Sequence, residues 1–561
     1  MTLEQIADKV VDTDVLVIGG GIAGCPAAAK AAEHGLKVTL VDKSKVDRSG
    51  SAAQGIDHYA GAFPRGMTPK EFIETTEEIG LSAYYGGYRW SDPTRIYRQY
   101  ANGMWAIEEL EKLGVTMKWD DEGIRPAAFM FGNPFIRVHW QNVKPEMAKG
   151  VRKRGVNVLE RTMIVDLLTN EGVVVGATAI DTRTGAFIAI RARATVIATA
   201  ACSRIFDPET PVPWKYKFRY HWCPASVSGD GWAMAYRAGA EVANMEQSGG
   251  YRRIRDDLNL SMGNFGNEGI RAKPLTSDGE EHLRLTPARF MELEEKGIDP
   301  FYFSLEHLPD DFHKRIEVAY VDERMVSFKI AEDRGFNPKT HWYELMDNRP
   351  FQLHVEPGIE ADADFKTTVK GLYAIGDSVA GNHDVANAAS MGFLLGDTIH
   401  GFIDESEDPV IDETQVESQK EIALAPLSVK DGTEPMELEC AIRYACTRYV
   451  GVSKAEGKLR EGLRRLASLK RVFLPKLMAK NPHYLMRALE VRSLIDTAEI
   501  HMNACMGRKE TRDNYIRIDC PEEDKSLDGK LLYQRLDKGK PVIEMRKVKP
   551  MALADDHKED R

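Results

Sequence analysis

Hydrophobic and polar positions near the start of the chain predict a βαβ unit. Residues 14–20, DVLVIGG, form an apolar, β-branched run that stops at glycine, which is typical of a buried parallel strand. Residues 22–34 are rich in alanine and are followed by Gly35, which predicts a helix with a glycine stop. VTLVD at 38–42 predicts a second strand. Strand, turn, helix and strand thus follow one another within about 30 residues.

Farther along the chain the pattern changes several times. Between 156 and 200, short apolar segments alternate with turns and predict strands, in the order VNVLE, MIVDLL, VVVGATAI, FIAIRA and TVIATA. Residues 230–244 predict a helix that leads to an edge. Residues 251–345 mix charged, aromatic, proline and glycine residues without a strong period, which indicates an inserted domain. GLYAIGD at 371–377 returns to the strand-then-glycine pattern. An amphipathic helical pattern covers about 430–510, and the polar last 45 or so residues predict short strands.

Composition and charge argue against several classes of protein, namely nucleic-acid-binding, membrane and secreted proteins. The chain has 561 residues, 43% hydrophobic and 29% charged, enough for a large core and several domains. A formal net charge of -11 argues against nucleic acid or an anionic membrane as the main partner. Because no run of about 18 apolar residues occurs, we expect no spanning helix. The first residues lack the basic and apolar regions of a signal peptide, so we expect a cytoplasmic protein.

The seven cysteines are scattered, and no two of them form a C-x-x-C pair. Such spacing predicts no disulfide framework. It also provides no ligand set for an iron–sulfur cluster of the chain's own, because a cluster needs grouped thiolates.

A glycine motif lies between the first predicted strand and helix. Gly19, Gly21 and Gly24 form G-x-G-x-x-G there. The first glycine permits the tight turn, the second lets the backbone approach a pyrophosphate, and the third allows close packing of helix and strand. The helix N-terminus favours phosphate, and Asp42 at the end of the second strand can accept a hydrogen bond from a ribose hydroxyl. The motif predicts a dinucleotide site and, by itself, leaves FAD and NAD open.

Two further segments favour FAD. RSGSAAQG at 48–55 has small residues that let the backbone pass close to a bulky ring. Asp377, far downstream in GLYAIGD, follows a predicted strand and suits the ribityl or pyrophosphate groups. A second cofactor contact so distant in sequence fits an elongated FAD better than a nucleotide held by one βαβ unit.

Several segments together resemble one family. GGGIAG, RSGSAAQG, VIATAA, SGDG, HVEPGIEAD and GLYAIGD occur in the order of the succinate dehydrogenase/fumarate reductase flavoprotein superfamily. The resemblance covers nearly the whole chain, and RKETRDNYIRIDCPEED is similar to the family's R-x-E-S-R-G-x-H-x-R-x-D-x-P segment. Within the superfamily, RSGSAAQG and MEQSGGYRRIRDD most resemble the α subunit of dissimilatory adenylylsulfate reductase and its relatives.

The resemblance implies an architecture of mixed α/β and helical parts. A Rossmann-like FAD-binding domain of the glutathione-reductase type would cover about 1–250 and 346–405. An α+β capping domain over about 251–345 would interrupt it. A helical C-terminal domain and tail would follow over about 406–561.

The resemblance also implies cofactor contacts and shows two departures. Quinone-linked members attach the flavin covalently to a histidine where Ser49 stands, so we expect non-covalent FAD. The same enzymes have a substrate histidine where this chain has Tyr251, so succinate or fumarate is not the expected substrate. The implied FAD contacts are Gly19, Gly21, Gly24, Asp42, Lys43, Ser49, Gly50, Gln54, Gly55, Ala198, Thr199, Asp230, Asp377 and Ser390.

The candidate catalytic residues are cationic. His354 lies in HVEPGIEAD, which resembles an active-site segment near the flavin, and histidine can donate to an anion or shuttle a proton. Arg253 corresponds to a substrate arginine of adenylylsulfate reductases. Arg289 lies where fumarate reductases have a proton-donating arginine, but Phe290 replaces the aspartate beside it. His383 is a weaker candidate, in the region of a substrate arginine.

The expected activity is electron transfer through FAD between a ferredoxin-like iron–sulfur partner and a small anionic substrate. Gly249 replaces a phenylalanine that would stack on adenine in adenylylsulfate reductases, so we favour reduction of an activated C=C bond in an organic acid. Two alternatives stay open: adenylylsulfate reduction, and an electron-transfer subunit of a heterodisulfide-reductase-like complex. An FAD monooxygenase would want a second nucleotide-contact motif and a different downstream pattern, and the sequence shows neither. The sequence does not identify the substrate.

Overall fold

The predicted βαβ unit is present as β1 (Lys9–Ile18), α2 (Gly24–Glu33) and β2 (Val38–Asp42). These elements belong to a computed structural model in which alternate residues of β1 enter two different cores. Leu16 and Ile18 pack into one hydrophobic cluster, and Val15 and Val17 into another on the opposite face. The near-continuous apolar run therefore fits a strand that is covered on both faces. The residues described are 2–54, 58–59, 66–78, 92–118, 125–126, 136–137, 142–206, 224–248, 254–255, 273–281, 292–311, 313–314, 335, 337, 340, 342–345, 353, 356–381, 385–404, 406–512 and 515–548.

β1 lies in a seven-stranded sheet with the order β6-β2-β1-β9-β8-β7, and β16 also pairs with β9. β1 is parallel to both neighbours, with Val17 opposite Leu40 of β2 and Val196 of β9. β16 is also parallel to β9, whereas β8 runs antiparallel to both of its neighbours, β7 and β9. The remaining strands are β6 (Asn157–Glu160), β7 (Thr162–Asn170), β8 (Val173–Asp181), β9 (Phe187–Ile197) and β16 (Leu372–Ala374).

Two details of this sheet differ from the pattern read in the sequence. FIAIRA and the first three residues of TVIATA belong to one strand, β9, which ends at Ile197. Arg191 and Arg193 take partly exposed positions in it, and no turn residue separates the two segments. The helix predicted over 230–244 ends at Arg237, and a turn leads from it to β10 (Val242–Ala243). In both places strand pairing decided the element. Polar residues at alternate positions are compatible with a strand as well as with a turn, and a short helical pattern does not fix where the helix ends.

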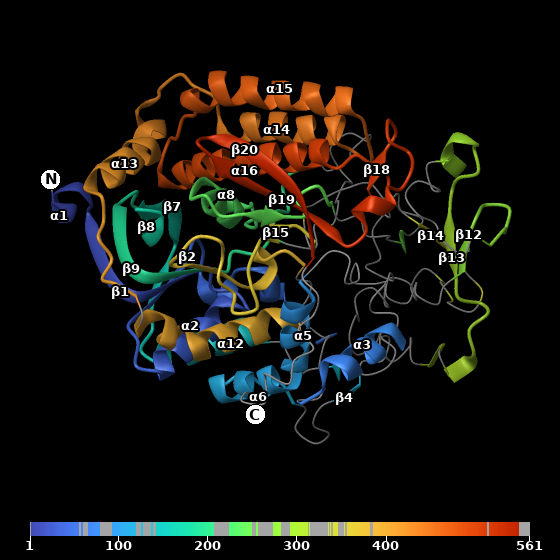
Figure 1. Ribbon diagram of the computed structural model, residues 1–561, viewed down its shortest axis with the longest axis horizontal. Helices are drawn as coiled ribbons and strands as arrows, with labels where there is room; N and C mark the ends of the chain where they lie inside the picture. Colours follow the sequence, from blue (N-terminus) through green and yellow to red (C-terminus); the bar gives the residue numbers. More distant parts are fainter. Residues whose placement is uncertain are drawn as a thin grey trace.

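Helices cover both faces of the sheet (Figure 1). α2 and α12 lie against one face and are packed closely on each other, with α5, α6 and α7 beside them. On the other side, α8 and the C-terminal bundle of α14, α15 and α16 cover the sheet. The helices are α1 (Leu3–Ile6), α3 (Pro69–Glu78), α5 (Pro93–Ala101), α6 (Gly103–Leu113), α7 (Val143–Lys153), α8 (Asp230–Arg237), α12 (Val385–Asp404), α13 (Glu413–Ser428), α14 (Pro435–Tyr449), α15 (Glu456–Val472) and α16 (Pro482–Gly507).

The end of the chain returns to the first part of the fold. β19 (Lys530–Asp537) pairs with β10 and with β20 (Lys540–Lys547), and β15 (Gly358–Ile359) completes this four-stranded sheet. The C-terminal strands therefore share a sheet with residues before and after the predicted insertion. Two smaller sheets consist of β3 (His58–Tyr59), β4 (Arg125–Pro126) and β5 (Ile136–Arg137), and of β17 (Ser453–Lys454) and β18 (Ile516–Arg517).

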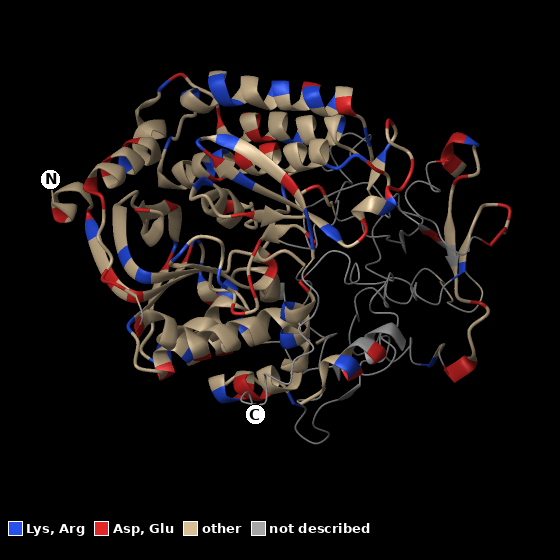
Figure 2. Cartoon of the chain, in the orientation of Figure 1, with Lys and Arg blue, Asp and Glu red and all other residues tan. Residues whose placement is uncertain are grey.

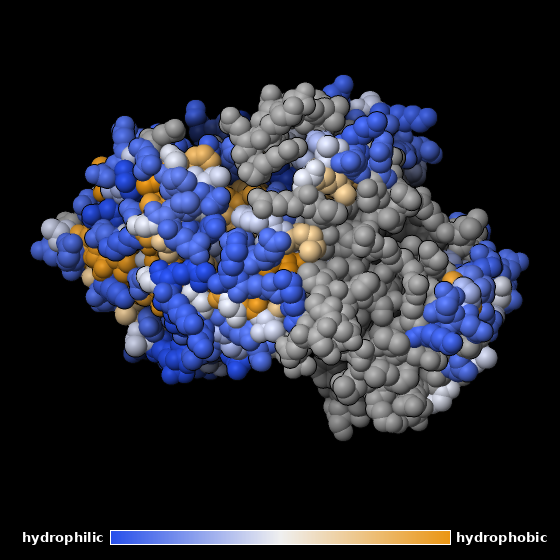
Figure 3. Space-filling view, turned by 90° about the horizontal axis from the view of Figure 1, so that it is seen from below, coloured by the Kyte–Doolittle hydropathy of each residue, from blue (hydrophilic) through white to orange (hydrophobic). Residues whose placement is uncertain are grey.

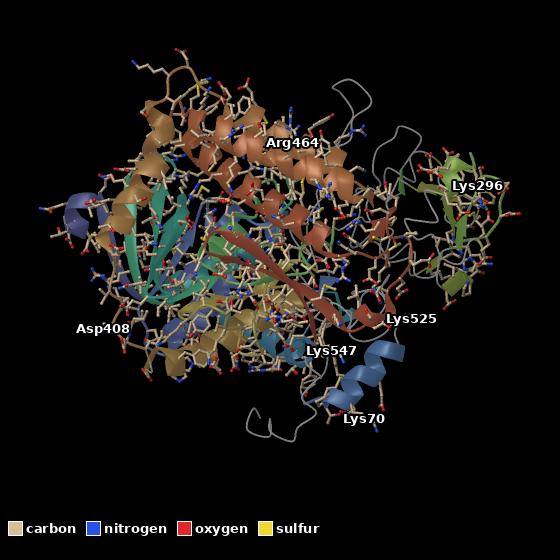
Figure 4. The ribbon with its side chains drawn as sticks, turned by 45° about the horizontal axis from the view of Figure 1, so that its top comes forward. Lys70, Lys296, Asp408, Arg464, Lys525 and Lys547 are labelled. Carbon is tan, nitrogen blue, oxygen red and sulfur yellow. The ribbon has the colours of Figure 1, made fainter. Side chains whose placement is uncertain are left out.

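The described strands of the predicted insertion form a sheet of their own, in the order β11-β14-β13-β12. Figure 1 shows β12 to β14 at one end of the molecule, and Figure 4 shows Lys296 there and Asp408 at the opposite end. Their common sheet supports the predicted capping unit, although its limits stay a prediction. The strands are β11 (Ile254–Arg255), β12 (Lys273–Leu275), β13 (Tyr302–Ser304) and β14 (Trp342–Leu345).

Charge is distributed unevenly over the helices (Figure 2). α15 carries arginines and lysines along its outer side, whereas α12, which is packed on α2, has only two charged residues, Asp397 and Asp404. On the face seen from below, hydrophilic residues cover most of the described part, with apolar residues between them (Figure 3). No helix among the described residues is both long and apolar enough to cross a membrane.

The contact between α2 and α12 provides a test of the fold. A Cβ at Gly392 would lie 2.2 Å from the carbonyl oxygen of Ala23, whereas a Cβ at Gly401 of the same helix would meet no described atom within 4 Å. We expect Gly392→Ala to lower the free energy of unfolding by about 3 kcal/mol, because the helices must separate. Gly401→Ala should leave it unchanged or raise it by up to about 1 kcal/mol. Denaturant unfolding of both variants measures the difference, and equal stabilities would contradict this account of the packing.

Candidate cofactor site

A pocket opens where β1 and β9 end and α2 begins. Its empty space is about 970 Å³, including the part that is open to solvent. The glycine-rich turn, the residues after β2, the segment 49–52, the start of β7 and the residues after β9 line it. Asp230 of α8 and Asp377 complete the wall. Ten of the predicted cofactor contacts line this pocket: Gly19, Gly21, Asp42, Lys43, Ser49, Gly50, Ala198, Thr199, Asp230 and Asp377.

The three glycines of the motif occupy three different environments. Gly19 has a φ of 106°, and a Cβ there would lie 2.3 Å from the carbonyl oxygen of Ala198. A Cβ at Gly24 would lie 1.9 Å from the carbonyl oxygen of Gly19, so this position serves the packing of α2 on the strand. A Cβ at Gly21 would meet no described atom within 4 Å and would project into the space that Gly21 lines. Gly21 therefore leaves room for a ligand to approach the backbone.

The first turn of α2 suits an anion. Its N-cap residue is Ala23, whose side chain cannot cap the helix. The N–H of Cys25 donates to the carbonyl oxygen of Gly21, so the positive end of the helix dipole is what this turn chiefly offers an anion. Lys144 of α7 is only 2% exposed and donates to the carbonyl oxygen of Gly20. A buried ammonium group thus lies directly against the glycine-rich turn. Lys144 was not among the predicted site residues, because nothing in its local sequence distinguishes it from a surface lysine.

Asp42 fixes the turn as well as facing the pocket. Its Oδ2 accepts from the backbone N–H of Gly20 at 2.9 Å and from the hydroxyl of Ser49 at 3.3 Å. Its Oδ1 accepts from the backbone N–H of Ser44 at 2.8 Å. One carboxylate therefore ties together the glycine-rich turn, the end of β2 and the segment that follows.

Lys43 and Asp230 contact each other. The Lys43 Nζ lies 2.7 Å from Asp230 Oδ2 and 2.8 Å from Glu490 Oε1 of α16. Burial by itself would lower the pKa of Lys43, but the two carboxylates outweigh it and raise that pKa. Burial likewise would raise the pKa of Glu490, whereas Lys43, Arg204 and Arg487 together lower it to about 2. The lysine and the carboxylate of Glu490 are therefore both charged near neutral pH.

α12 contributes one residue to the pocket wall and has two buried polar groups close to it in the sequence. Ala388 of this helix lines the pocket. Ser390 and Asn387 lie one helical turn apart and are 0% and 1% exposed. Within the described part of the chain, Ser390 Oγ and Asn387 Oδ1 have no hydrogen-bond partner. Such atoms fit a polar ligand, because a buried polar group left unpaired is costly. Ser390 was predicted, whereas Asn387 was not.

Several predicted residues cannot be placed. Gly55, Arg253, Arg289, His354 and His383 lie outside the described residues. Gln54 ends the short 3-10 helix Ser51–Gln54, but the structure does not describe its side chain. The roles of these residues, and the flavin contacts of those that line the pocket, stay predictions.

Taken together, the described groups suit an adenine dinucleotide. The glycine-rich turn and the N-terminus of α2 can hold a pyrophosphate. Asp42 lines the same pocket, so its carboxylate can accept a hydrogen bond from a ribose hydroxyl. Asp377 and α12 lie on the downstream side, where a second nucleotide or a flavin would extend. A site of this shape can bind FAD through residues that are more than 300 positions apart in the sequence.

Two family models match the chain, and together they cover well over half of it. One, described as FAD binding domain, matches residues 14–249, which include the glycine motif and Asp230. The other, described as fumarate reductase flavoprotein C-term, matches residues 441–559. The chain contains an FAD-binding domain and a C-terminal domain of the fumarate reductase flavoprotein type. Its cofactor is FAD, and it is an FAD-dependent oxidoreductase, as the motifs predicted.

Relatives of this flavoprotein have different named activities. It is 24% identical over 570 residues to a subunit of the fumarate reductase (CoM/CoB) of Methanothermobacter marburgensis, covering 92% of this chain and 95% of that protein. It is 25% identical over 572 residues to L-aspartate oxidase of Vibrio cholerae, covering 92% and 97%. The structure of adenylylsulfate reductase from Archaeoglobus fulgidus has a TM-score of 0.79 at 24% identity and covers 97% of both chains. That likeness confirms the predicted fold and no more.

Asp42 provides a test of the cofactor site in this flavoprotein. We expect Asp42→Ala to weaken FAD binding by roughly 30-fold, about 2 kcal/mol, because a charge-assisted contact and the anchor of the turn are lost together. Titrating the apoprotein with FAD measures the change. Asp12→Ala is the control, since that carboxylate is 58% exposed and pairs with Arg191 at the surface, 3.3 Å away. Unchanged FAD affinity in Asp42→Ala would show that the turn is fixed by other contacts.

Proposed function

We propose that this flavoprotein reduces an activated C=C bond of a small organic anion with electrons from a partner iron–sulfur protein. FAD bound in the pocket would supply hydride transfer from N5. The single observation that carries the proposal is a set of cationic residues, Arg253, Arg289 and His354, in segments that resemble the family's substrate site. Similarity to the fumarate reductase (CoM/CoB) protein over nearly the full length of both chains supports it.

The cationic residues would act on the substrate's charge. Paired N–H donors of Arg253 and Arg289 would bind a carboxylate and hold the double bond over the flavin ring. His354 would donate to a substrate oxygen or deliver a proton. Tyr251 in place of the substrate histidine of quinone-linked members argues for an acid other than fumarate or succinate.

Adenylylsulfate reduction is the second candidate. RSGSAAQG and the segment that contains Arg253 favour it, because they most resemble the α subunit of adenylylsulfate reductase. Against it, Gly249 replaces the phenylalanine that would stack on adenine. Bleaching of the oxidised flavin by sulfite plus AMP would select this reaction over C=C reduction.

The scattered cysteines lead us to expect that the electrons come from another protein. No two of the seven form a C-x-x-C pair in the sequence, so this chain offers no grouped thiolates for a cluster of its own. A small ferredoxin-like protein with such runs would supply the electrons. Steady turnover with NADH alone, and no added protein, would argue against that partner.

The flavin should be released by acid. Ser49 occupies the position of the histidine that carries covalent flavin in related enzymes, and a serine hydroxyl does not form that bond. We expect all the FAD to remain in the supernatant when the purified protein is precipitated with acid and centrifuged. Its absorbance there, compared with that of the native protein, gives the released fraction. A yellow pellet would contradict non-covalent binding.

Three substitutions test the proposed substrate site. We expect Arg253→Ala, Arg289→Ala and His354→Ala each to keep FAD but to lower turnover by at least ~100-fold, because removing one positioned donor to developing charge costs about 3–4 kcal/mol. Reoxidation of a reduced viologen dye by a panel of α,β-unsaturated acids measures turnover.

Arg464→Ala is the matched control for these arginines. Its side chain is 68% exposed on the outer face of α15 and pairs with Glu461 (Figure 4), so its loss should not change turnover. If His354→Ala kept wild-type activity with every acid tested, the match of HVEPGIEAD to the active-site segment would be wrong. The reductase proposal would then rest on the flavin site alone.

A further inference from the structure

Lys43 has no donor left for the cofactor. An ammonium group has three N–H donors. Lys43 uses them on Ser228 Oγ at 2.8 Å, Asp230 Oδ2 at 2.7 Å and Glu490 Oε1 at 2.8 Å. Although Lys43 lines the pocket, all three N–H donors of its ammonium group are therefore bound to neighbouring side chains. Its role is to hold them in position.

Glu490 connects this lysine to the C-terminal helices. It is 1% exposed, and while Oε1 accepts from Lys43, Oε2 accepts from Arg204 at 2.9 Å and also from Arg487. Glu439 of α14 continues the network, 3.3 Å from Arg204 and 2.9 Å from Arg487. Buried charges of this kind contribute little net stability but fix geometry strongly, because an unpaired one is very costly.

Asp230 is the point where the network meets the pocket. Its Oδ2 accepts from Lys43 and from the hydroxyl of Ser228 at 2.8 Å. Its Oδ1 is buried and has no partner among the described residues, and Asp230 as a whole is 8% exposed. A carboxylate oxygen in that situation suits an N–H or O–H donor of a ligand, because a buried acceptor without a donor is costly.

The position of Asp230 indicates which half of the cofactor supplies that donor. Asp42, at the end of β2, marks the ribose of the adenine half. Lys43 and Ser44 continue the same wall of the pocket, and Val227 and Met234 provide apolar surface beside Asp230. The base that is attached to the ribose would lie there, with its exocyclic amino group as the N–H donor.

We propose that Glu490 is a positioning residue for the adenine half of FAD. It holds Lys43, Lys43 holds Asp230, and Asp230 presents Oδ1 to the amino group of the adenine. FAD binding is thereby linked to the docking of α16, which lies more than 400 residues away in the sequence from the glycine motif. The inference rests on the proposed non-covalent attachment of FAD and is independent of the substrate.

The test uses ligands that separate the two halves of the cofactor. Apoprotein of the full chain is titrated with FAD, with ADP, which carries only the adenine half, and with FMN, which lacks adenine. We expect Glu490→Gln to weaken binding of FAD and ADP by the same factor, roughly tenfold, since a charge-assisted contact that orients Asp230 is lost. FMN binding should not change. Glu490→Asp, which keeps the charge, should recover part of the ADP affinity.

Glu439→Gln is the matched control. It also removes a carboxylate that is 1% exposed and paired with Arg204 and Arg487, but this one does not contact Lys43. We expect it to lower the unfolding temperature about as much as Glu490→Gln while changing ADP affinity less than twofold. A merely structural role of Glu490 would make the two variants alike in both measurements.

Two results would overturn the inference. One is equal loss of ADP affinity in Glu439→Gln and Glu490→Gln, and the other is unchanged ADP affinity in Glu490→Gln. If Glu490→Gln does not give stable apoprotein, the rate of FAD release from the holoprotein, measured for all three variants by flavin fluorescence, provides the same comparison. Failure of the non-covalent attachment is distinguishable, because the acid pellet would then be yellow.

Discussion

Direct backbone contact between the first turn of α2 and two neighbouring elements underlies the whole cofactor site. Gly24 lies against the carbonyl oxygen of Gly19, Gly19 against that of Ala198, and Gly392 of α12 against that of Ala23. None of these positions leaves room for a Cβ. The helix N-terminus is consequently held at the end of β1 and β9, where its N–H groups can face a pyrophosphate. Asp42 and Lys144 then fix the turn from two further sides.

Electrostatic contacts extend this site into the C-terminal part of the chain. Lys43 directly follows β2, Asp230 belongs to α8 and Glu490 to α16, and all three side chains are largely buried. Together with the pairing of β19 with β10, they connect the last third of the chain to the dinucleotide-binding sheet. The helical bundle is therefore part of the support of the cofactor pocket. We therefore expect its position to affect FAD binding through Lys43 and Asp230.

The fold by itself leaves the substrate open. Relatives with the same architecture are named as fumarate reductase, L-aspartate oxidase and adenylylsulfate reductase. A flavin fold can support several reactions, because the side chains over the ring select the substrate. In this chain those candidates are Arg253, Arg289 and His354, which belong to segments outside the described residues. Their residue types, and the segments that contain them, favour an anionic substrate, and their mutual geometry stays a prediction.

The sequence by itself determined the βαβ unit, the role of Gly19 in the tight turn, the role of Gly24 in packing, the FAD cofactor and the resemblance to the family. The βαβ unit and the glycine motif depend on residues a few positions apart, so local spacing and period are enough to predict them. FAD and the family were predicted from several short motifs and from their order along the chain. Only the tertiary structure decided that FIAIRA and the first three residues of TVIATA belong to one strand and that β10 pairs with β19. Only the tertiary structure, likewise, showed that Lys43 is saturated by Ser228, Asp230 and Glu490, that Lys144 lies against the glycine-rich turn, and that Asn387 is buried beside Ser390. Contacts of this kind join residues up to 447 positions apart, and neither the period nor the residue type of one segment specifies which distant side chain will meet it.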